Sequence, residues 1–426
     1  MAGDVNIAVI GSGVSGLGAA LSLQGREGIA VTLFEADVRP GGHAHTVDVT
    51  YGPETIPVDT GFIVYNELNY PELTAFFRWA GIDTTASDMS FALSANGGGF
   101  EWCGRHDNPL SGLFAQKRNL LSPGFYLFLR DILRFQTQAR ADVAAGSVGA
   151  GSLRDYLTRH RFSARLRDDY IVPMGAAIWS LSQGQTLDFP AESFLAFFEN
   201  HRLLQWDRPR WRTVARGSRS YVRHIHNLLG DRLRLGQAVR SVQRGTEGVT
   251  IVDSSGTSHR FDAVIMATHA PTALSLLANA TTAEQQVLGA FRVSANRVVL
   301  HRDTALMPQR RAAWAAWNLI RSESDERVAV TYWMNRLQQI PEHLPLFVTL
   351  NPVAEPAPDK VFRTFSYNHP VFDAAAIAAQ RQLHRIQGQD RIWFAGAWTG
   401  YGFHEDGFRS GLKAAAALGG LVPWLR

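Results

Sequence analysis

The chain has 426 residues, of which 46% are hydrophobic and 19% are charged, so it can hold two domains or one large α/β unit with an insertion. Its single cysteine, Cys103, excludes an internal disulfide and a cysteine-based metal site, and we expect no metal. The net charge of +4 is spread over many arginines, which suits anionic ligands or anionic lipid and does not indicate nucleic acid.

We expect neither a leader segment nor a membrane-spanning helix. The first strand is expected to begin near Asn6, which leaves no room for a signal peptide. No apolar run reaches the roughly 18 residues that cross a bilayer. Together with the lone cysteine, these features predict a cytoplasmic protein.

The first 35 residues carry a dinucleotide-binding pattern. The apolar run 7–10 predicts a buried parallel strand, and three glycines at GxGxxG spacing follow it. Gly11 permits a tight turn, Gly13 lets the backbone approach a pyrophosphate, and Gly16 lets the next helix pack on the strand. A second predicted strand ends in Glu35, whose carboxylate can bind an adenosine ribose. The pattern predicts a Rossmann-like unit and leaves the choice between NAD and FAD open.

Two further segments narrow that choice, "GGHAHTV" at 41–47 and "VDTGFIVYN" at 58–66. They resemble the flavin amine oxidase and phytoene desaturase superfamily, although His43 stands where amine oxidases usually carry arginine. They are more similar to a bacterial branch of predicted NAD/FAD-binding proteins, often encoded near methyltransferases, that includes desaturases of methyl-branched acyl chains in furan fatty acid synthesis. The resemblance covers most of the chain. Arg216 in "VARGSR" departs from it, because a second glycine is expected there.

The resemblance implies noncovalently bound FAD and an α/β fold in two parts. We expect a Rossmann-like FAD-binding domain from residues 1–68, 215–275 and 385–426, with an inserted α+β substrate domain from residues 69–214 and 276–384.

The C-terminal segment 394–412 is implied to return to the first domain and to aim a helix N-terminus, beginning near residues 405–407, at the flavin. A purely structural capping turn, with Asp406 satisfying helix amides, remains the alternative. The fingerprint and the resemblance together assign cofactor contacts to Gly11, Ser12, Gly13, Ser15, Gly16, Glu35, Ala36, Gly41, Gly42, His43, Thr60, Gly61, Phe62, Val239, Ala267, Gly396, Glu405, Asp406 and Gly407.

The middle of the chain mixes strands and helices. Residues 232–269 read as three or four short strands with polar turns. Residues 122–140 predict a helix with Ser122 as N-cap and Pro123 at the first helical position. That helix either packs on its own domain or forms a membrane-facing surface or tunnel mouth, with apolar side chains at Phe125, Phe128, Leu129, Ile132 and Leu133.

Seven arginines fall between residues 201 and 223 with one acid, Asp207. They form either a solvated basic face or a docking site for phospholipid headgroups. We therefore expect peripheral contact with the inner face of the membrane.

The resemblance implies an FAD-dependent desaturase of a fatty-acyl chain. Such a reaction needs a proton acceptor, and the sequence offers two candidates. His404 is the first candidate, because imidazole titrates near neutrality, and Tyr65 is the second; a structural hydrogen-bonding role is the alternative for both. Other functions stay open: a redox-neutral fatty acid isomerase, an amine oxidase, or a non-enzymatic FAD-containing lipid-binding partner of a methyltransferase. The terminal motif has no cysteine for a thioether to flavin.

Overall fold

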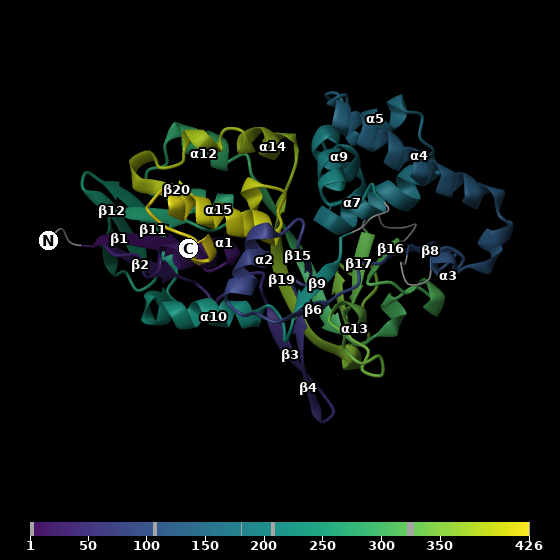
Figure 1. Cartoon of the computed structure of the whole chain (residues 1–426), viewed down its shortest axis with the longest axis horizontal. Helices are drawn as coiled ribbons and strands as arrows, with labels where there is room; N and C mark the ends of the chain where they lie inside the picture. The colour runs from purple at the N-terminus through teal and green to yellow at the C-terminus, as the bar shows by residue number, and fades with distance from the viewer. Residues whose placement is uncertain (1–3, 105–108, 180, 206–208, 322–327, 426) are drawn as a thin grey trace.

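The computed structural model describes residues 4–104, 109–179, 181–205, 209–321 and 328–425. A five-stranded parallel sheet lies at one end of the molecule, on the left of Figure 1. Parallel strands require crossovers and covered faces, so this sheet confirms the predicted Rossmann-like α/β unit. Its strand order is β10 (Leu233–Arg234), β2 (Ile29–Phe34), β1 (Val5–Ile10), β14 (Ala263–Met266) and β20 (Ile392–Phe394).

Each face of this sheet has its own hydrophobic core. Because successive side chains of a strand point to opposite faces, Ile7 and Val9 of β1 lie in one core and Ala8 and Ile10 in the other. The first core contains helices α1 (Val14–Leu23), α2 (Pro71–Trp79), α10 (Arg219–Leu229) and α15 (His404–Ala416). The second contains the antiparallel strands β11 (Val239–Gly245), β12 (Gly248–Asp253) and β13 (Ser258–Phe261), and helices α11 (Ala270–Leu276), α12 (Thr282–Leu288) and α14 (Ala374–Gln380).

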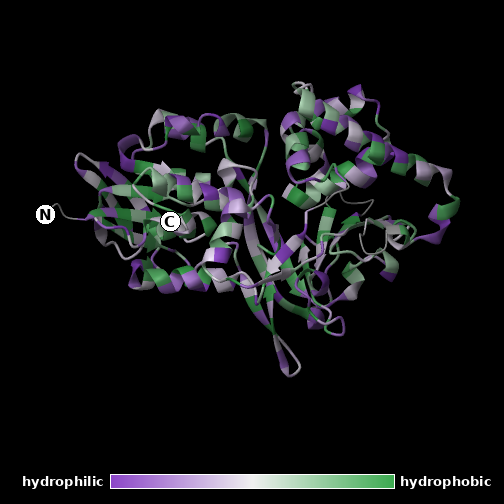
Figure 2. Cartoon of the chain, in the orientation of Figure 1, coloured by the Kyte–Doolittle hydropathy of each residue, from purple (hydrophilic) through white to green (hydrophobic). Residues whose placement is uncertain are grey.

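A seven-stranded mixed sheet forms the second half of the molecule. Its order is β19 (Val361–Val371), β15 (Arg292–His301), β18 (Phe347–Leu350), β17 (Val328–Trp333), β16 (Trp317–Arg321), β7 (Phe91–Ala95) and β8 (Phe100–Gly104). It shares a core with α4 (Pro123–Ala145), α5 (Leu153–Arg159), α7 (Val172–Trp179), α8 (Gln183–Leu187) and α9 (Ala191–Asn200). Figure 2 shows hydrophobic residues concentrated in the strands, whereas α4 and α10 carry both colours.

Two small sheets connect the halves. A hairpin of β3 (Thr46–Tyr51) and β4 (Glu54–Asp59) projects at the bottom of Figure 1. Strand β9 (Trp211–Val214) pairs with both β5 (Tyr65–Asn66) and β6 (Thr84–Ala86). The predicted strands of residues 232–269 are present as β10 to β14. Helices α12 and α14 fall within the stretch 276–384 assigned to the inserted domain, yet they pack in the core of the parallel sheet.

Helix α4 is longer than the sequence predicted and is capped differently. It extends to Ala145 and ends at Gly146, which adopts the left-handed conformation. Ser122 occupies the N-cap position, but its side chain makes no capping hydrogen bond. Phe125, Phe128 and Ile132 are buried in the core, as expected of a packed helix, whereas Leu133 is exposed.

The arginines between residues 201 and 223 are spread over several elements. Arg212 on β9 donates to Thr84, and Arg219 on α10 forms an ion pair with Asp48 at 2.6 Å. Residues 206–208, which include the single acid, lie outside the described residues. Two of these arginines therefore fasten neighbouring strands, and the expected headgroup site at this segment receives no support from their contacts.

Replacing Arg216 by glycine is expected to stabilise the protein. Arg216 has φ +62° and Gly217 has φ +85°, so the position where the resemblance implies a glycine does have a left-handed backbone. Strain relief of about 1–2 kcal/mol outweighs the extra flexibility of glycine in the unfolded chain, and we expect a net gain of about 0.5–1 kcal/mol. Urea unfolding of the Arg216→Gly variant measures it. Arg223→Gly, inside α10, is the control and should destabilise; a loss for Arg216→Gly would contradict the strain.

Candidate active site

A cavity of about 900 Å³ lies between the carboxyl edge of the parallel sheet and the seven-stranded sheet. One end of it contacts the turn after β1, the end of β2 and the loop after β14. Residues predicted to bind the cofactor that line this end are Gly11, Gly13, Ser15, Glu35, Gly42, His43, Thr60, Gly61, Phe62, Ala267 and Gly396. The structure therefore brings together segments from the start, the middle and the end of the chain.

The three glycines of the fingerprint have different surroundings. A Cβ on Gly16 would lie 1.8 Å from the Gly11 carbonyl oxygen, so only glycine lets α1 start this close to the strand. A Cβ on Gly13 would meet nothing within 4 Å and would point into open space. Gly13 is also the N-cap of α1, without a side chain to satisfy the helix amides. Those amides are available to an anionic group in the cavity.

Glu35 is fixed at the end of β2. Its carboxylate accepts hydrogen bonds from the Ser12 backbone N–H at 2.8 Å, from the Ser12 hydroxyl at 2.5 Å and from the Asp37 N–H at 2.9 Å. Carboxylate oxygens accept more than one hydrogen bond each, so Glu35 can also receive ribose hydroxyls from the cavity side. Ala36 and Val239 are also predicted from the sequence to contact the cofactor. Neither is among the described residues that line the cavity.

His43 faces the cavity in a neutral form. Burial is the main reason that its pKa is lowered to about 3, with contributions from His369 and His269. Its Nε2 is buried and has no hydrogen-bond partner among the described residues. A buried polar atom of this kind fits a polar edge of a ligand bound in the cavity. Together with the open space at Gly13 and the carboxylate of Glu35, it fits FAD.

The "DTGF" segment has one side chain buried in the protein and the next facing the cavity. Asp59 is fully buried and accepts from the Thr46 hydroxyl at 2.6 Å and from the Ser218 N–H at 2.9 Å. Burial raises the pKa of Asp59 to about 6. The next residue faces the cavity: the Thr60 hydroxyl lies 2.7 Å from the hydroxyl of Tyr367 on β19. Asp59 thus joins the hairpin to the turn before α10, and the residues after it line the cavity.

Glycines in the C-terminal helix serve helix packing. A Cβ on Gly411 would lie 1.9 Å from the Ser15 carbonyl oxygen, and one on Gly407 would lie 2.8 Å from the Val14 side chain. The sequence predicts a cofactor contact for Gly407; its surroundings show a packing role, which Gly411 shares. Both glycines allow α15 to lie against α1.

The acidic pair of the same segment caps backbone. Glu405 accepts from the Glu72 and Leu73 N–H groups at the start of α2, at 2.9 and 3.1 Å, and burial raises its pKa to about 7. Asp406 accepts from Tyr401 N–H at 3.1 Å and Phe403 N–H at 3.0 Å. Neither lines the described cavity. The capping alternative holds for Asp406, and no side-chain contact from either acid reaches the cofactor end.

His404 lines the cavity as a half-buried, neutral ring. It stacks on Phe62 with ring centroids 3.8 Å apart and planes 6° apart, and its Nε2 lies 2.6 Å from the Tyr221 hydroxyl. Burial lowers its pKa to about 3, so the expected titration near neutrality is wrong. Tyr65 packs against Tyr70 and Phe77 and is not among the described residues that line the cavity. These contacts favour the structural alternative for both residues.

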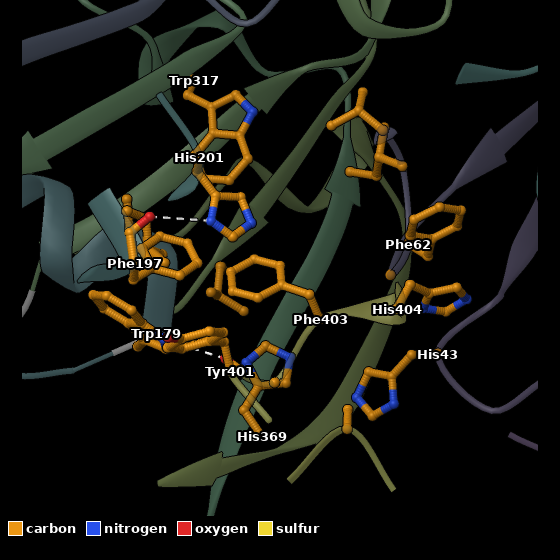
Figure 3. Close-up of a pocket in the computed structure, with 18 of the residues that line it drawn as sticks. His43, Phe62, Trp179, Phe197, His201, Trp317, His369, Tyr401, Phe403 and His404 are labelled. Atoms are coloured by element: carbon orange, nitrogen blue, oxygen red, sulfur yellow. Dashed lines mark hydrogen bonds between the residues drawn. The ribbon is translucent and has the colours of Figure 1, made fainter. Parts of the chain in front are cut away.

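The other end of the cavity is aromatic and aliphatic. Figure 3 shows Phe403 between two groups of rings: Trp179, Phe197, His201 and Trp317 on one side, and His43, Phe62 and His404 on the other. Phe403 stacks on Phe197 with centroids 5.0 Å apart. Beyond these rings, the wall consists of Trp102, Leu113, Leu129, Ile132, Leu133 and Gln136. Among the described lining residues, Glu35 is the only carboxylate and none is arginine or lysine.

Sequence reasoning missed the cavity residues of β19. Tyr367 and His369 approach His43, with ring centroids 5.3 and 5.5 Å away. They alternate along a half-exposed edge strand, and no motif surrounds them. His269, which follows β14, also lines the cavity. It lies 6.1 Å from His43 by ring centroid.

The family of flavin containing amine oxidoreductases matches residues 14–310, more than two thirds of the chain. The chain belongs to this family. It is therefore a flavin-dependent oxidoreductase with FAD as its cofactor, and its Rossmann-like sheet is the part that binds the dinucleotide.

Solved structures show the same fold at low identity. Cyclohexylamine oxidase from Brevibacterium oxydans IH-35A superposes with a TM-score of 0.71 at 16% identity, covering 97% of this chain and 98% of that one. Wild-type putrescine oxidase bound to putrescine gives 0.69 at 15% identity, with 97% and 99% covered. A CLA-producing fatty acid isomerase from P. acnes gives 0.66 at 14% identity, with 98% and 99% covered.

Among the described residues, no helix is both long and apolar enough to cross a membrane.

Proposed function

We propose that this FAD-dependent oxidoreductase desaturates a fatty-acyl chain, with a methyl-branched chain as the preferred substrate. The observation that carries the proposal is the apolar half of the cavity. Its wall includes Phe403 and Trp179, which Figure 3 shows, and also Leu129 and Ile132 on α4. A long hydrocarbon chain gains favourable burial along such a wall.

The described lining of the cavity offers no free carboxylate to bind a charged amine substrate. An ammonium group leaving water needs a carboxylate or several acceptors to replace its hydration. Glu35, the carboxylate of the described lining, is already held by Ser12 at the nucleotide end. The imidazoles of His43 and His369 are kept neutral, since burial lowers their pKa values to about 3 and about 4.

Bound FAD would supply the electron sink, accepting a hydride from one carbon of the chain while the neighbouring carbon loses a proton. The protein's own part is to bind, orient and exclude water. The stacked rings of Phe403 and Phe197 narrow the cavity next to Phe62 and His404, which lie at the cofactor end. A chain threaded past them is held away from water at that point. The lost proton passes to one of the cavity imidazoles, which burial keeps weakly basic, with pKa values of about 3 for His404 and about 4 for His369.

Anaerobic single turnover tests the proposal. Oxidised, FAD-loaded protein is mixed with methyl-branched and unbranched acyl lipids, and flavin absorbance is followed. We expect bleaching with the branched chain and, for each reduced flavin, one product chain lighter by two hydrogens in mass spectrometry. A product of unchanged mass would identify an isomerase. Bleaching by amines with no response to any lipid would identify an amine oxidase.

A blocked cavity provides the matched comparison. Leu129→Trp fills the acyl end of the cavity, far from the nucleotide end, so it should retain FAD and slow bleaching by acyl lipid at least tenfold. Thr137→Trp, on the exposed side of the same helix, should bleach at the wild-type rate. Equal rates for both variants would count against an acyl chain bound along α4.

A further inference from the structure

An exposed apolar surface surrounds the start of α4. Among the described residues, six of the fifteen exposed large hydrophobic side chains lie between residues 110 and 133. They come from α3 (Pro109–Leu113), the 3-10 helix Lys117–Leu121 and α4, at the right of Figure 1. We call this set the α4 surface: Leu110, Leu120, Leu121, Tyr126, Leu127 and Leu133.

These elements are held together beneath the surface. Phe114 packs against the rings of Phe125 and Tyr126, and the Tyr126 hydroxyl donates to the Leu120 carbonyl at 3.0 Å. The exposed leucines therefore stand on a packed base. Leu121 is 89% exposed, the largest value among them. Exposed leucines gathered in one place mark an interaction surface, whereas leucines scattered singly do not.

The cavity reaches this surface. Leu133 is 43% exposed and also lines the cavity, together with Leu129 on the preceding turn of α4 and Leu113 at the end of α3. One turn of α4 thus separates the apolar exterior from the apolar interior. A hydrocarbon chain can pass from one to the other without crossing a polar stretch among these residues.

A basic hollow adjoins the same surface. Arg118, Arg165 and Arg321 line it together with Ser122, which directly follows the most exposed leucine. The single carboxylate of its lining, Asp169, is shared by Arg321 at 2.8 Å and Arg165 at 3.5 Å. Three guanidinium groups against one carboxylate leave an excess of positive charge. Such a hollow attracts a phosphate carried by a lipid.

We propose that the α4 surface docks on an anionic phospholipid bilayer, with the basic hollow receiving a headgroup phosphate and the cavity mouth at Leu133 receiving an acyl chain. The apolar side chains enter the headgroup boundary, while Lys117, Arg118, Arg130 and Arg134 lie around them to meet anionic charge. This deepens the proposed function, on which the acyl part rests, by naming the bilayer as the source of the substrate.

Co-sedimentation with vesicles tests the docking without any turnover. FAD-loaded protein is mixed with vesicles of phosphatidylcholine alone or with added phosphatidylglycerol. We expect binding to the anionic vesicles that weakens as salt rises. Leu121→Asp combined with Leu127→Asp should lower the partition coefficient at least tenfold. Arg118→Gln should lower it about fivefold on anionic vesicles and flatten its salt dependence.

Matched exposed leucines elsewhere serve as the control. Leu68 and Leu425, 53% and 80% exposed, are changed to aspartate together and should leave vesicle binding unchanged. FAD content and melting temperature verify that each variant is folded. Equal vesicle binding by the α4-surface variant and the control, or no binding by the wild type, overturns the docking. Vesicle binding without flavin bleaching by any acyl lipid overturns the proposed function and leaves the docking in place.

Discussion

The Gly13→Asp variant is expected to fold and to contain no FAD. A side chain at Gly13 meets no protein atom within 4 Å, so the substitution creates no clash. Gly13 is the N-cap of α1, where aspartate is a preferred residue and can satisfy the helix amides. The new carboxylate then occupies the amides that an incoming pyrophosphate needs and repels its charge.

The expected effect on FAD affinity is large. Two unit charges about 4 Å apart interact by about 4 kcal/mol at an effective dielectric constant of 20, which corresponds to roughly a thousandfold change in dissociation constant. Flavin absorbance of the purified variant and titration of the apoprotein with FAD measure it. Thermal melting of the apoprotein should show an equal or higher midpoint than the wild-type apoprotein.

Gly184→Asp is the matched control. Gly184 also faces open space, lies in α8 and does not line the described cavity. It should retain wild-type FAD content. Stoichiometric FAD in Gly13→Asp, or loss of FAD from both variants, would remove Gly13 from the cofactor site.

The protein is expected to lose stability steeply as the pH falls below 6.5. Besides the less buried His45, five histidines are held neutral mainly by burial, with pKa values of about 3 for His43 and His404 and about 4 for His201, His301 and His369. Each pKa lies below the unfolded value of about 6.5. The stability from each group is therefore fully present above pH 6.5 and is lost as the pH falls towards the folded pKa.

The size of this loss is comparable with the whole stability of a domain. Because an unfolded imidazole is only half protonated at pH 6.5, each histidine contributes about 1 kcal/mol between pH 6.5 and 5.5, and five of them amount to about 5 kcal/mol. Asp59 and Glu405 act in the opposite direction, because burial raises their pKa values to about 6 and about 7. Two carboxyls offset part of the effect of five imidazoles. Urea unfolding of the holoprotein at a series of pH values measures the slope.

His301 does not line the described cavity, so a substitution there tests the contribution of one histidine without changing the cofactor site. Its Nδ1 accepts the Asp303 backbone N–H at 3.0 Å, so its Nε2–H donates to the Thr349 hydroxyl at 2.7 Å. Protonation of His301 at Nδ1 would place its new N–H group against the Asp303 backbone N–H, and two donors repel each other. His301→Gln should reduce the loss of stability between pH 6.5 and 5.5 by about 1 kcal/mol. An unchanged slope in this variant, or a wild-type protein equally stable at pH 7 and 5.5, would contradict the prediction.

The positions where the backbone needs glycine could be predicted from the sequence. Gly11, Gly13 and Gly16 have spacing set by a turn, a close approach and a helix contact, and these are local demands that a short motif can carry. The sequence likewise predicts a glycine where Arg216 stands, and the positive φ of Arg216 shows that this position has a backbone conformation that favours glycine.

The partners that each side chain contacts could not be predicted from the sequence. Glu405 and Asp406 looked like flavin contacts because they begin a helix beside glycines, yet both bind backbone N–H groups of neighbouring segments. The sequence predicts that His404 titrates near neutrality, but in the fold the ring stacks on Phe62 and desolvation lowers its pKa to about 3. Tyr367 reaches the cavity through strand pairing between distant segments. Such partners depend on the whole fold.

The close packing of α15 on α1 also links the two ends of the sheet during folding. Strands β1 and β2 and helix α1 are synthesised well before β20 and α15, which complete the sheet and cover α1. Until then, the apolar faces of α1 and of β14 have no partner from the C-terminal segment. We therefore expect a chain that lacks α15 to expose the apolar face of α1 and to bind FAD more weakly than the full chain, which flavin absorbance of the purified truncated protein measures.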